Sequence, residues 1–269
     1  MRKMVITLLA LGVFAASAAF AGTLLNEGFT YADGGLVGLN PGAPAVGPWV
    51  MYSGVNDIKI VSNQAVGGSP AANYGDGDDH IPFALQTTSN STYACFRAMI
   101  PCWGATAPQA VYFAGFNTTA NATLMMSRVY VLSQGTTGGW TFGISNTSTN
   151  ATYGATPWTS TLTCDTWYTL VIKYDPTTGT STLWVNPVNE SSPSVSNTRN
   201  DLSPSAINTF FLRQSASAST FPSPGYPGST QWHWVVDEVG VGNVWAEACY
   251  TAPVPVNGQT WGQLKTMYR

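Results

Sequence analysis

The sequence predicts an all-β fold in which two antiparallel sheets pack face to face as a sandwich. Most of the chain consists of short apolar or alternating runs, broken by clusters of Gly, Pro, Asn and Ser, which is typical of strands and turns. No convincing helical period occurs before the C-terminal tail, and strands without intervening helices indicate antiparallel sheets. The length of 269 residues suits one large sandwich, because all-β domains often run to about 250 residues without dividing.

Nine segments satisfy the strand pattern. They are residues 58–61, 92–99, 111–116, 124–132, 140–144, 167–174, 181–185, 209–213 and 232–241.

The clearest of these segments is residues 167–174, which predicts one arm of a hairpin. Tyr168, Leu170, Ile172 and Tyr174 share one face by the two-residue period of a strand. Residues 175–179 then read Asp-Pro-Thr-Thr-Gly, a turn in which Pro fixes φ and Gly tolerates positive φ. We therefore expect residues 180–185 to return along the first arm.

Three segments carry a resemblance to a known superfamily. The hairpin reads Trp-Tyr-x-Leu-x-Ile-x-Tyr-Asp, a Gly turn and Leu-Trp-Val-Asn, which resembles the central hairpin of laminin-G-like and concanavalin-A-like domains. Residues 27–36 are similar to the opening of exported bacterial members, which often read Glu-x-Phe-x-Tyr, and residues 234–241 resemble their closing strand. The resemblance implies a concanavalin-A-like, two-sheet antiparallel jelly-roll sandwich over residues 22–250.

That superfamily includes lectins, adhesion modules and glycoside hydrolases, so the fold does not choose the function. Its retaining β-glucanases carry a Glu-x-Asp-x-x-Glu strand that supplies two carboxylates to one cleft. No glutamate of this chain after residue 21 has an Asp two positions later. Asp237 and Glu238 are adjacent, so in a strand their side chains point to opposite faces. We therefore expect a non-enzymatic protein, with glycoside hydrolysis as the less favoured alternative.

The N-terminus predicts export. Arg2 and Lys3 precede an apolar run, residues 4–14, and Ala19-Phe20-Ala21 fits the small-x-small rule for signal peptidase, with cleavage before Gly22. This indicates a signal peptide over residues 1–21 and a secreted, extracellular or cell-surface protein. The apolar run is shorter than the roughly 20 residues that span a bilayer, and we expect no transmembrane segment.

The charge of the chain narrows the class of partner. The formal net charge is −3, and charged residues make up only 9% of the chain. A mildly acidic surface argues against nucleic acid or anionic lipid as the partner.

Four cysteines remain after residue 21, and an even number in an exported chain favours two disulfides. Of the three pairings, we favour Cys95 with Cys102, which are close in sequence, and Cys164 with Cys249. No Cys-x-x-Cys spacing indicates a zinc site.

An acidic, Gly-rich segment, residues 73–80, is the candidate metal site. Asp76, Asp78 and Asp79 lie within four positions, and a Gly-rich loop could turn their oxygens toward a calcium ion. The segment lacks the bidentate Glu that ends an EF-hand loop, and a solvated acidic turn is the alternative. We expect calcium as the one candidate cofactor.

Aromatic residues are the candidate ligand contacts, because ten tryptophans and twelve tyrosines are many for this length. Five lie at or beside loop-like Gly/Pro segments, where a ring could stack on a sugar; they are Trp103, Trp140, Trp158, Tyr226 and Trp232. The alternative for each ring is a place in the sandwich core.

The C-terminal residues 251–269 predict a linker and a short tail with a helical pattern at Trp261, Leu264 and Tyr268. Two functions stay open. The first is a module that binds carbohydrate or another extracellular surface component. The second is a structural subunit that assembles with copies of itself into a filament, sheath or surface layer.

Overall fold

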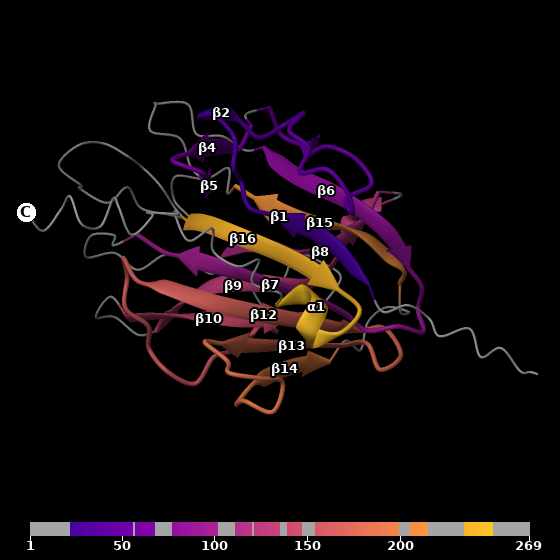
Figure 1. The fold of residues 1–269 in the computed structure, drawn as a ribbon. Helices are drawn as coiled ribbons and strands as arrows, with labels where there is room; N and C mark the ends of the chain where they lie inside the picture. Colours follow the sequence, from indigo (N-terminus) through magenta and orange to yellow (C-terminus); the bar gives the residue numbers. More distant parts are fainter. Residues whose placement is uncertain are drawn as a thin grey trace, which may run out of the picture.

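Two antiparallel sheets packed face to face form the body of the protein (Figure 1). The computed structural model describes residues 22–55, 57–67, 77–101, 111–119, 121–134, 139–146, 154–198, 205–214 and 234–249. In Figure 1 the nine-stranded sheet lies toward the viewer and strands of the seven-stranded sheet lie behind it. The all-β jelly-roll sandwich expected from the sequence is confirmed.

The nine-stranded sheet contains the predicted hairpin at one edge and the N-terminal strands at the other. Its strands, in spatial order, are β14 (Val195–Thr198), β13 (Thr180–Val185), β12 (Trp167–Asp175), β7 (Thr92–Met99), β16 (Trp234–Gly242), β5 (Gln64–Gly67), β4 (Lys59–Val61) and β2 (Gly34–Gly35). The ninth strand, β1 (Thr23–Glu27), pairs with the second half of β16, beyond β5.

The seven-stranded sheet follows a simpler path. Its strands, in spatial order, are β11 (Thr156–Pro157), β10 (Gly139–Ser145), β9 (Asn121–Gln134), β8 (Val111–Thr118), β15 (Ile207–Arg213), β6 (Asp78–Gln86) and β3 (Val50–Ser53).

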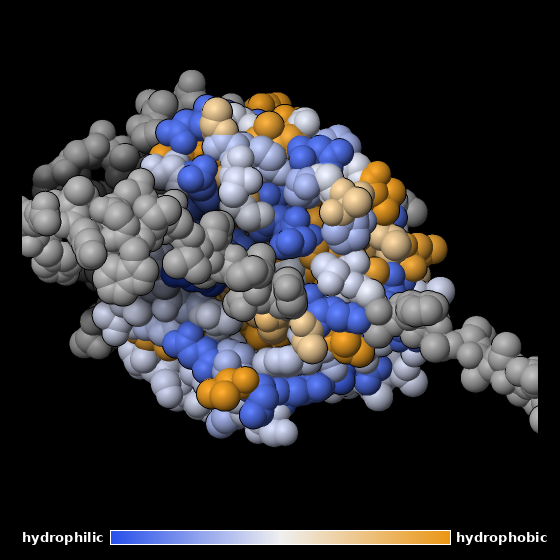
Figure 2. All heavy atoms as spheres, in the orientation of Figure 1, coloured by the Kyte–Doolittle hydropathy of each residue, from blue (hydrophilic) through white to orange (hydrophobic). Residues whose placement is uncertain are grey.

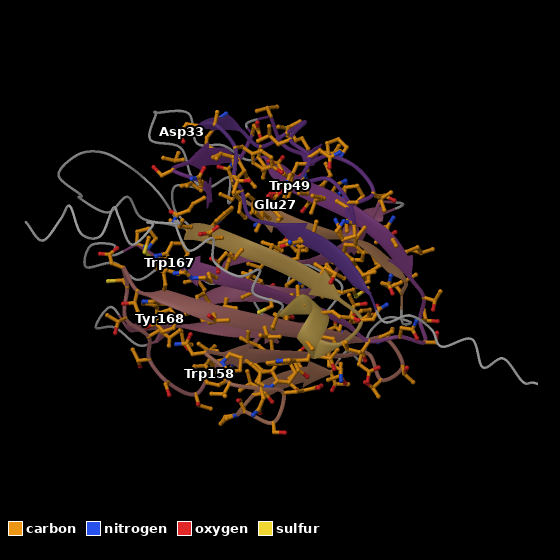
Figure 3. All side chains as sticks on the ribbon, viewed as in Figure 1. Glu27, Asp33, Trp49, Trp158, Trp167 and Tyr168 are labelled. Atoms are coloured by element: carbon orange, nitrogen blue, oxygen red, sulfur yellow. The ribbon has the colours of Figure 1, made fainter. Side chains whose placement is uncertain are left out.

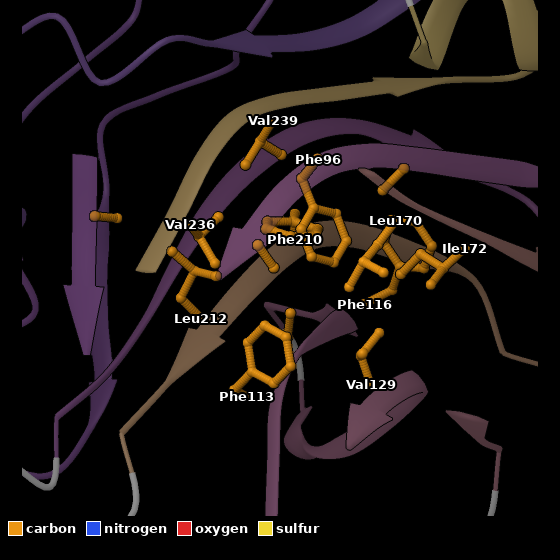
Figure 4. Packing of buried hydrophobic residues seen from close by; sticks show 14 of the residues in the cluster. Phe96, Phe113, Phe116, Val129, Leu170, Ile172, Phe210, Leu212, Val236 and Val239 are labelled. Carbon is orange, nitrogen blue, oxygen red and sulfur yellow. The ribbon is translucent and has the colours of Figure 1, made fainter. Parts of the chain in front are cut away.

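Apolar side chains from both sheets interdigitate to form the core (Figure 4). Phe96 of β7 packs against Phe113 of β8 and Phe210 of β15, with ring centroids 6.4 and 5.6 Å apart. Leu170 and Ile172 point into the same cluster, as do Tyr168 and Tyr174. The face that the sequence predicts for the hairpin strand is therefore confirmed, and burial of such side chains is the main driving force for the sandwich.

A short helix, α1 (Trp245–Ala248), follows β16 and contacts β16, β1 and β7 of the nine-stranded sheet. Within the part of the chain that the structure describes, no helix is long and apolar enough to cross a membrane.

The favoured pairing of the cysteines is wrong. Cys95 and Cys249 are free thiols, whereas Cys164 is disulfide-bonded, and Cys102 lies outside the described residues. The reason is geometric: Cys95 lies in the middle of β7, which stays extended to Met99 at about 3.3 Å per residue. The strand therefore does not turn back toward Cys95 within Thr92–Met99.

Candidate functional site

Two of the five sequence-predicted aromatic contacts, Trp140 and Trp158, lie within the described residues. Trp140 is 2% exposed and belongs to the core, where its ring packs edge-on against Phe142, so its assignment as a ligand contact is wrong. Trp158 is half-buried against the same core. The other three rings, Trp103, Tyr226 and Trp232, lie outside the described residues.

The expected calcium ligands do not converge. Asp78 and Asp79 are the first two residues of β6, so strand alternation sends their side chains to opposite faces of the sheet. Asp79 points toward the interior, whereas Asp78 faces outward and accepts a hydrogen bond from Ser53 at 2.7 Å. Asp76 lies outside the described residues, and within those residues no group of three or more His, Cys, Asp and Glu is arranged to hold a metal ion. Asp78 and Asp79 therefore do not fit the predicted site.

Asp79 instead makes an acid pair with Asp57. The two carboxyl groups are hydrogen-bonded to each other, and Asp79 Oδ2 accepts a bond of 3.0 Å from the backbone N–H of Ile58. Burial, first, and the bond to Asp57, second, raise the pKa of Asp79 to about 8. The raised pKa favours the protonated form of Asp79, which can donate to Asp57 and so connect the residues before β4 to the start of β6.

Glu27 is a second interior acid, and it explains the Glu-x-Phe-x-Tyr motif. Its Oε1 accepts from the backbone N–H of Phe29 at 2.7 Å, and its Oε2 accepts from Trp49 Nε1 at 2.8 Å and from Tyr31 Oη at 3.0 Å. Figure 3 shows Glu27 beside Trp49. Burial raises the pKa of Glu27, and the three hydrogen bonds oppose that rise. The motif thus organises the N-terminal segment around one buried carboxyl group.

The strongest candidate site lies on the outer face of the seven-stranded sheet, the face directed away from the core. Strand alternation places eight aromatic or charged side chains of five strands there. We call this group the aromatic–cation face; it consists of Tyr52, Asp78, His80, Tyr112, Arg128, Tyr130, Phe211 and Arg213.

Cross-strand register brings these side chains together. Asp78 is the partner of Arg213 between β6 and β15, and His80 is the partner of Phe211. Tyr112 is the partner of Tyr130 between β8 and β9. Directly opposed side chains on one face of a sheet are close enough to interact, so the register assembles a continuous surface.

The rings of the face contact one another. Tyr52 stacks on His80 with ring centroids 5.0 Å apart and an interplanar angle of 13°. Phe211 lies edge-on between Tyr52 and Tyr112, at 6.4 and 6.2 Å. Phe211 fits there because its ring occupies the space above Gly115, where an added Cβ would lie 2.9 Å from the ring. Such pairs stabilise a fixed arrangement of the rings.

Two guanidinium groups flank Tyr112. The Arg213 guanidinium lies 4.4 Å from the centroid of the Tyr112 ring, and that of Arg128 lies 5.2 Å from it. Arg128 also lies 5.7 Å from the Tyr130 ring. All three distances are within the range of cation–π attraction, which favours Arg over aromatic faces.

One carboxylate balances these cations. Asp78 lies 3.5 Å from Arg213, whose side chain is 25% exposed, whereas the side chain of Asp78 is 8% exposed. Tyr52 and Tyr112 are half-buried, whereas the other five members of the face, Asp78, His80, Arg128, Tyr130 and Phe211, are buried. Arg213, Tyr52 and Tyr112 are therefore the members that solvent reaches most readily.

His80 is neutral at pH 7. Burial lowers its pKa from the ordinary value, and its Nδ1 has no hydrogen-bond partner within the described residues. The neighbouring Tyr52 hydroxyl also lacks one there, and burial together with Asp78 raises the pKa of Tyr52. The face thus offers an imidazole and a phenol that burial keeps neutral, together with two guanidinium groups.

This set is suited to recognition of a ligand that has both apolar faces and acceptor oxygens. Rings offer flat surfaces, and guanidinium groups offer several N–H donors in a fixed plane. Asp78 is the one carboxylate among the eight members of the aromatic–cation face, whereas two-carboxylate hydrolysis of a sugar bond needs a pair. Apart from Asp78, the sequence analysis singled out none of these eight side chains as a site residue.

Comparison with known proteins gives structural likeness only. No sequence family matches the chain, and no curated protein is detectably similar in sequence. Among solved structures, the chain is similar to an endo-beta-1,4-glucuronan lyase from the fungus Trichoderma reesei, at 12% identity over 80% of this chain and 96% of that chain, with a TM-score of 0.44. It is also similar to peanut lectin, at 14% identity over 79% of this chain and 97% of that chain, with a TM-score of 0.43. A third is the CBM2 module of the evolved Dit protein of Lactobacillus casei BL23 phage J-1, at 12% identity, 84% and 97% coverage, and a TM-score of 0.45.

Proposed function

We propose that the protein binds an acidic carbohydrate through the aromatic–cation face. The observation that carries this proposal is the Arg213–Tyr112–Arg128 arrangement, in which two guanidinium groups flank one ring on a sheet face directed away from the core. The residues of the chain itself therefore support a binding surface, independently of its likeness to other proteins.

The chemistry of the face fits a sugar that carries carboxylates. The flat C–H surface of a pyranose stacks on the half-buried ring of Tyr52, whereas Tyr112 holds the two guanidinium groups. A sugar carboxylate accepts two parallel N–H bonds from a guanidinium group, which is the strongest type of hydrogen bond available there. Ligand binding at Arg213 competes with its 3.5 Å ion pair to Asp78, and the exposed fraction of Arg213 leaves room for this exchange.

Electrostatics favour this ligand class locally. The whole chain has a formal charge of −3, so two guanidinium groups against one carboxylate make the face more positive than the molecule as a whole. A neutral glycan would gain the stacking but lose the charge-assisted bonds. The N-terminal segment that resembles a signal peptide supports an extracellular or cell-surface location for this binding.

The matched variants are Arg213→Ala and Arg97→Ala. Arg97, on the opposite sheet, also stacks on an aromatic ring, that of Trp167 at 4.7 Å, and pairs with a carboxylate, that of Glu238 at 3.5 Å. Calorimetric titration with polygalacturonate oligosaccharides should show at least a tenfold weaker affinity for Arg213→Ala, since charge-assisted bonds contribute about 1.5–3 kcal/mol. Arg97→Ala should bind like the unmodified protein.

A neutral and an acidic oligosaccharide together test whether charge is recognised. Cello-oligosaccharides, which are neutral, should bind at least tenfold more weakly than the acidic probe. Equal loss of affinity in both Arg variants, equal affinity for both probes, or no binding to either would overturn the proposal. Sedimentation velocity on the same samples tests the other function that the sequence leaves open: concentration-dependent assembly without glycan binding would favour a structural subunit.

A further inference from the structure

The helix α1 sits on a surface made by two glycines of β16. A Cβ added to Gly240 would lie 2.1 Å from the backbone oxygen of Ala248, and one added to Gly242 would lie 2.6 Å from Cβ of Glu247. Neither position can accept a side chain without moving α1. The absence of side chains at Gly240 and Gly242 therefore lets the backbone of α1 approach the sheet closely.

The packing of α1 on Gly240 and Gly242 places Cys249 opposite Cys95. Cys95 points outward from β7, and its partner across the strands is Gly240, on which α1 rests. Cys249 directly follows the last residue of α1, and its thiol makes a side-chain hydrogen bond with that of Cys95. Both are free thiols in the structure.

An apolar cluster surrounds the two thiols. Trp245 of α1 packs edge-on against Trp184 at 5.1 Å and against Tyr93 at 6.3 Å. The cluster as a whole consists of Tyr93, Cys95, Val171, Trp184, Trp245, Ala248 and Cys249. Cys95 is 9% exposed, whereas Cys249 is half-buried, so solvent reaches the pair from the side of Cys249.

We infer that Cys95 and Cys249 form a disulfide that locks α1 onto the outer face of the nine-stranded sheet. Two thiols in contact, on two segments whose backbones are already packed together, need little rearrangement to join. The cross-link closes a loop of more than half of the 269-residue chain, which is the arrangement that most restricts the unfolded state. A helix of four residues has little stability of its own, so a covalent anchor would have a large local effect.

The chemistry is a thiol–disulfide exchange with an external disulfide, such as oxidised glutathione or the active-site disulfide of an oxidoreductase. The Cys249 thiol loses its proton and attacks one sulfur of the oxidant, which releases one thiolate and leaves a mixed disulfide. Cys95 then loses its proton and attacks the Cys249 sulfur, which releases the second thiolate. Two protons and two electrons thus leave the protein, and one S–S bond forms.

Peptide mapping of the full chain tests this inference. The protein is incubated with oxidised glutathione, alkylated without reduction and digested, and the expected product is a peptide pair joined through Cys95 and Cys249. Alkylation of both cysteines after oxidation, or a peptide that joins either of them to Cys102 or Cys164, would overturn the inference.

Amide hydrogen exchange gives an independent readout. Oxidation should slow exchange of the amides of residues 245–249 at least tenfold and raise Tm by roughly 5–15 °C. The variants Cys95→Ser and Cys249→Ser keep a hydrogen-bonding group of similar size, and their exchange should be the same before and after oxidation. Equal exchange in oxidised and reduced unmodified protein would overturn the locking role. The proposed glycan-binding face lies on the other sheet, so a failure to bind glycan would leave the disulfide result unchanged.

Discussion

The two outer faces of the sandwich differ in what packs on them. On the nine-stranded sheet, α1 and its tryptophan cover part of the face, and the remaining side chains form separate pairs such as Arg97 with Trp167. Figure 2 shows this side of the molecule, where hydrophilic and intermediate residues surround small, separated hydrophobic patches. On the seven-stranded sheet, no described helix covers the aromatic–cation face, and its side chains contact one another across five strands. On one face a helix of the chain packs over the aromatic side chains, whereas on the other the aromatic side chains gather with two guanidinium groups.

This comparison predicts that large side chains contribute mainly to stability on the nine-stranded sheet and mainly to ligand binding on the seven-stranded sheet. Trp184→Ala should lower the free energy of unfolding by about 3–5 kcal/mol, because Trp184 is 4% exposed and packs against Trp245. Tyr112→Ala, on the other face, should cost only about 1–2 kcal/mol, since Tyr112 is half-buried. Urea unfolding measures both.

The binding assay completes that prediction. Tyr112→Ala should weaken binding of acidic oligosaccharides at least tenfold, while Trp184→Ala, measured where it remains folded, should not. The reverse pattern would mean that the binding surface lies on the nine-stranded sheet and not on the seven-stranded sheet.

The buried acid Glu27 allows a test of the interior of the nine-stranded sheet. Glu27 belongs to the nine-stranded sheet and satisfies three donors, so Glu27→Ala should cost about 2–4 kcal/mol by leaving Trp49 Nε1 and the Phe29 N–H without their acceptor. Glu27→Gln, which keeps one carbonyl acceptor, should cost about half as much. Thermal unfolding of the two variants at one pH measures the difference, and equal costs would contradict the hydrogen-bonding role.

The sequence predicted the strands better than it predicted the site. Segment 167–174 was placed within one residue because one of its faces repeats every second residue, and segment 92–99 because it is a long, mostly apolar run. Strand β6 was missed because it begins with Asp-Asp-His, which has the composition of a turn. That error also produced the calcium hypothesis, since Asp78 and Asp79 can converge on a loop but diverge in a strand.

The aromatic–cation face could not be predicted for a different reason. Its members come from five strands, and no short spacing in the sequence links Tyr52 to His80 or Tyr112 to Arg213. Only the sheet order β9-β8-β15-β6-β3 brings them together. The predicted cysteine pairing was wrong for a similar reason, because Cys95 and Cys249 meet only when α1 packs on Gly240.

Asp79 provides a pH test that separates the two interior acids. Its pKa is raised to about 8 in the folded protein, mainly by burial, against about 3.9 in an unfolded chain. Between these values the folded state holds a proton that the unfolded chain has released, so stability falls as pH rises from about 4 through 8. Urea unfolding should show a loss of at least about 2 kcal/mol between about pH 5 and pH 9.

The variant Asp79→Asn should remove most of that loss. An amide stays neutral and can donate permanently to Asp57, so the variant has no proton to lose at this position. A remaining smaller fall would be assigned to Glu27, whose pKa burial also raises. If Asp79→Asn kept the full pH dependence, the acid pair would not be its source.

The smallest expected effect falls on the pair that most resembles the proposed site. Arg97 and Glu238 are 37% and 46% exposed, so water screens their ion pair, and Arg97→Ala should change the free energy of unfolding by less than about 0.5 kcal/mol. Arg213→Ala should cost more, about 1 kcal/mol, because it removes the guanidinium that lies 3.5 Å from the mostly buried Asp78. Equal stability changes in urea would show that the other contacts of Asp78, such as its hydrogen bond from Ser53, stabilise it without Arg213. In that case Arg213 would be free to leave Asp78 for a ligand at no cost, and acidic oligosaccharides should bind more tightly than the ion pair would otherwise allow.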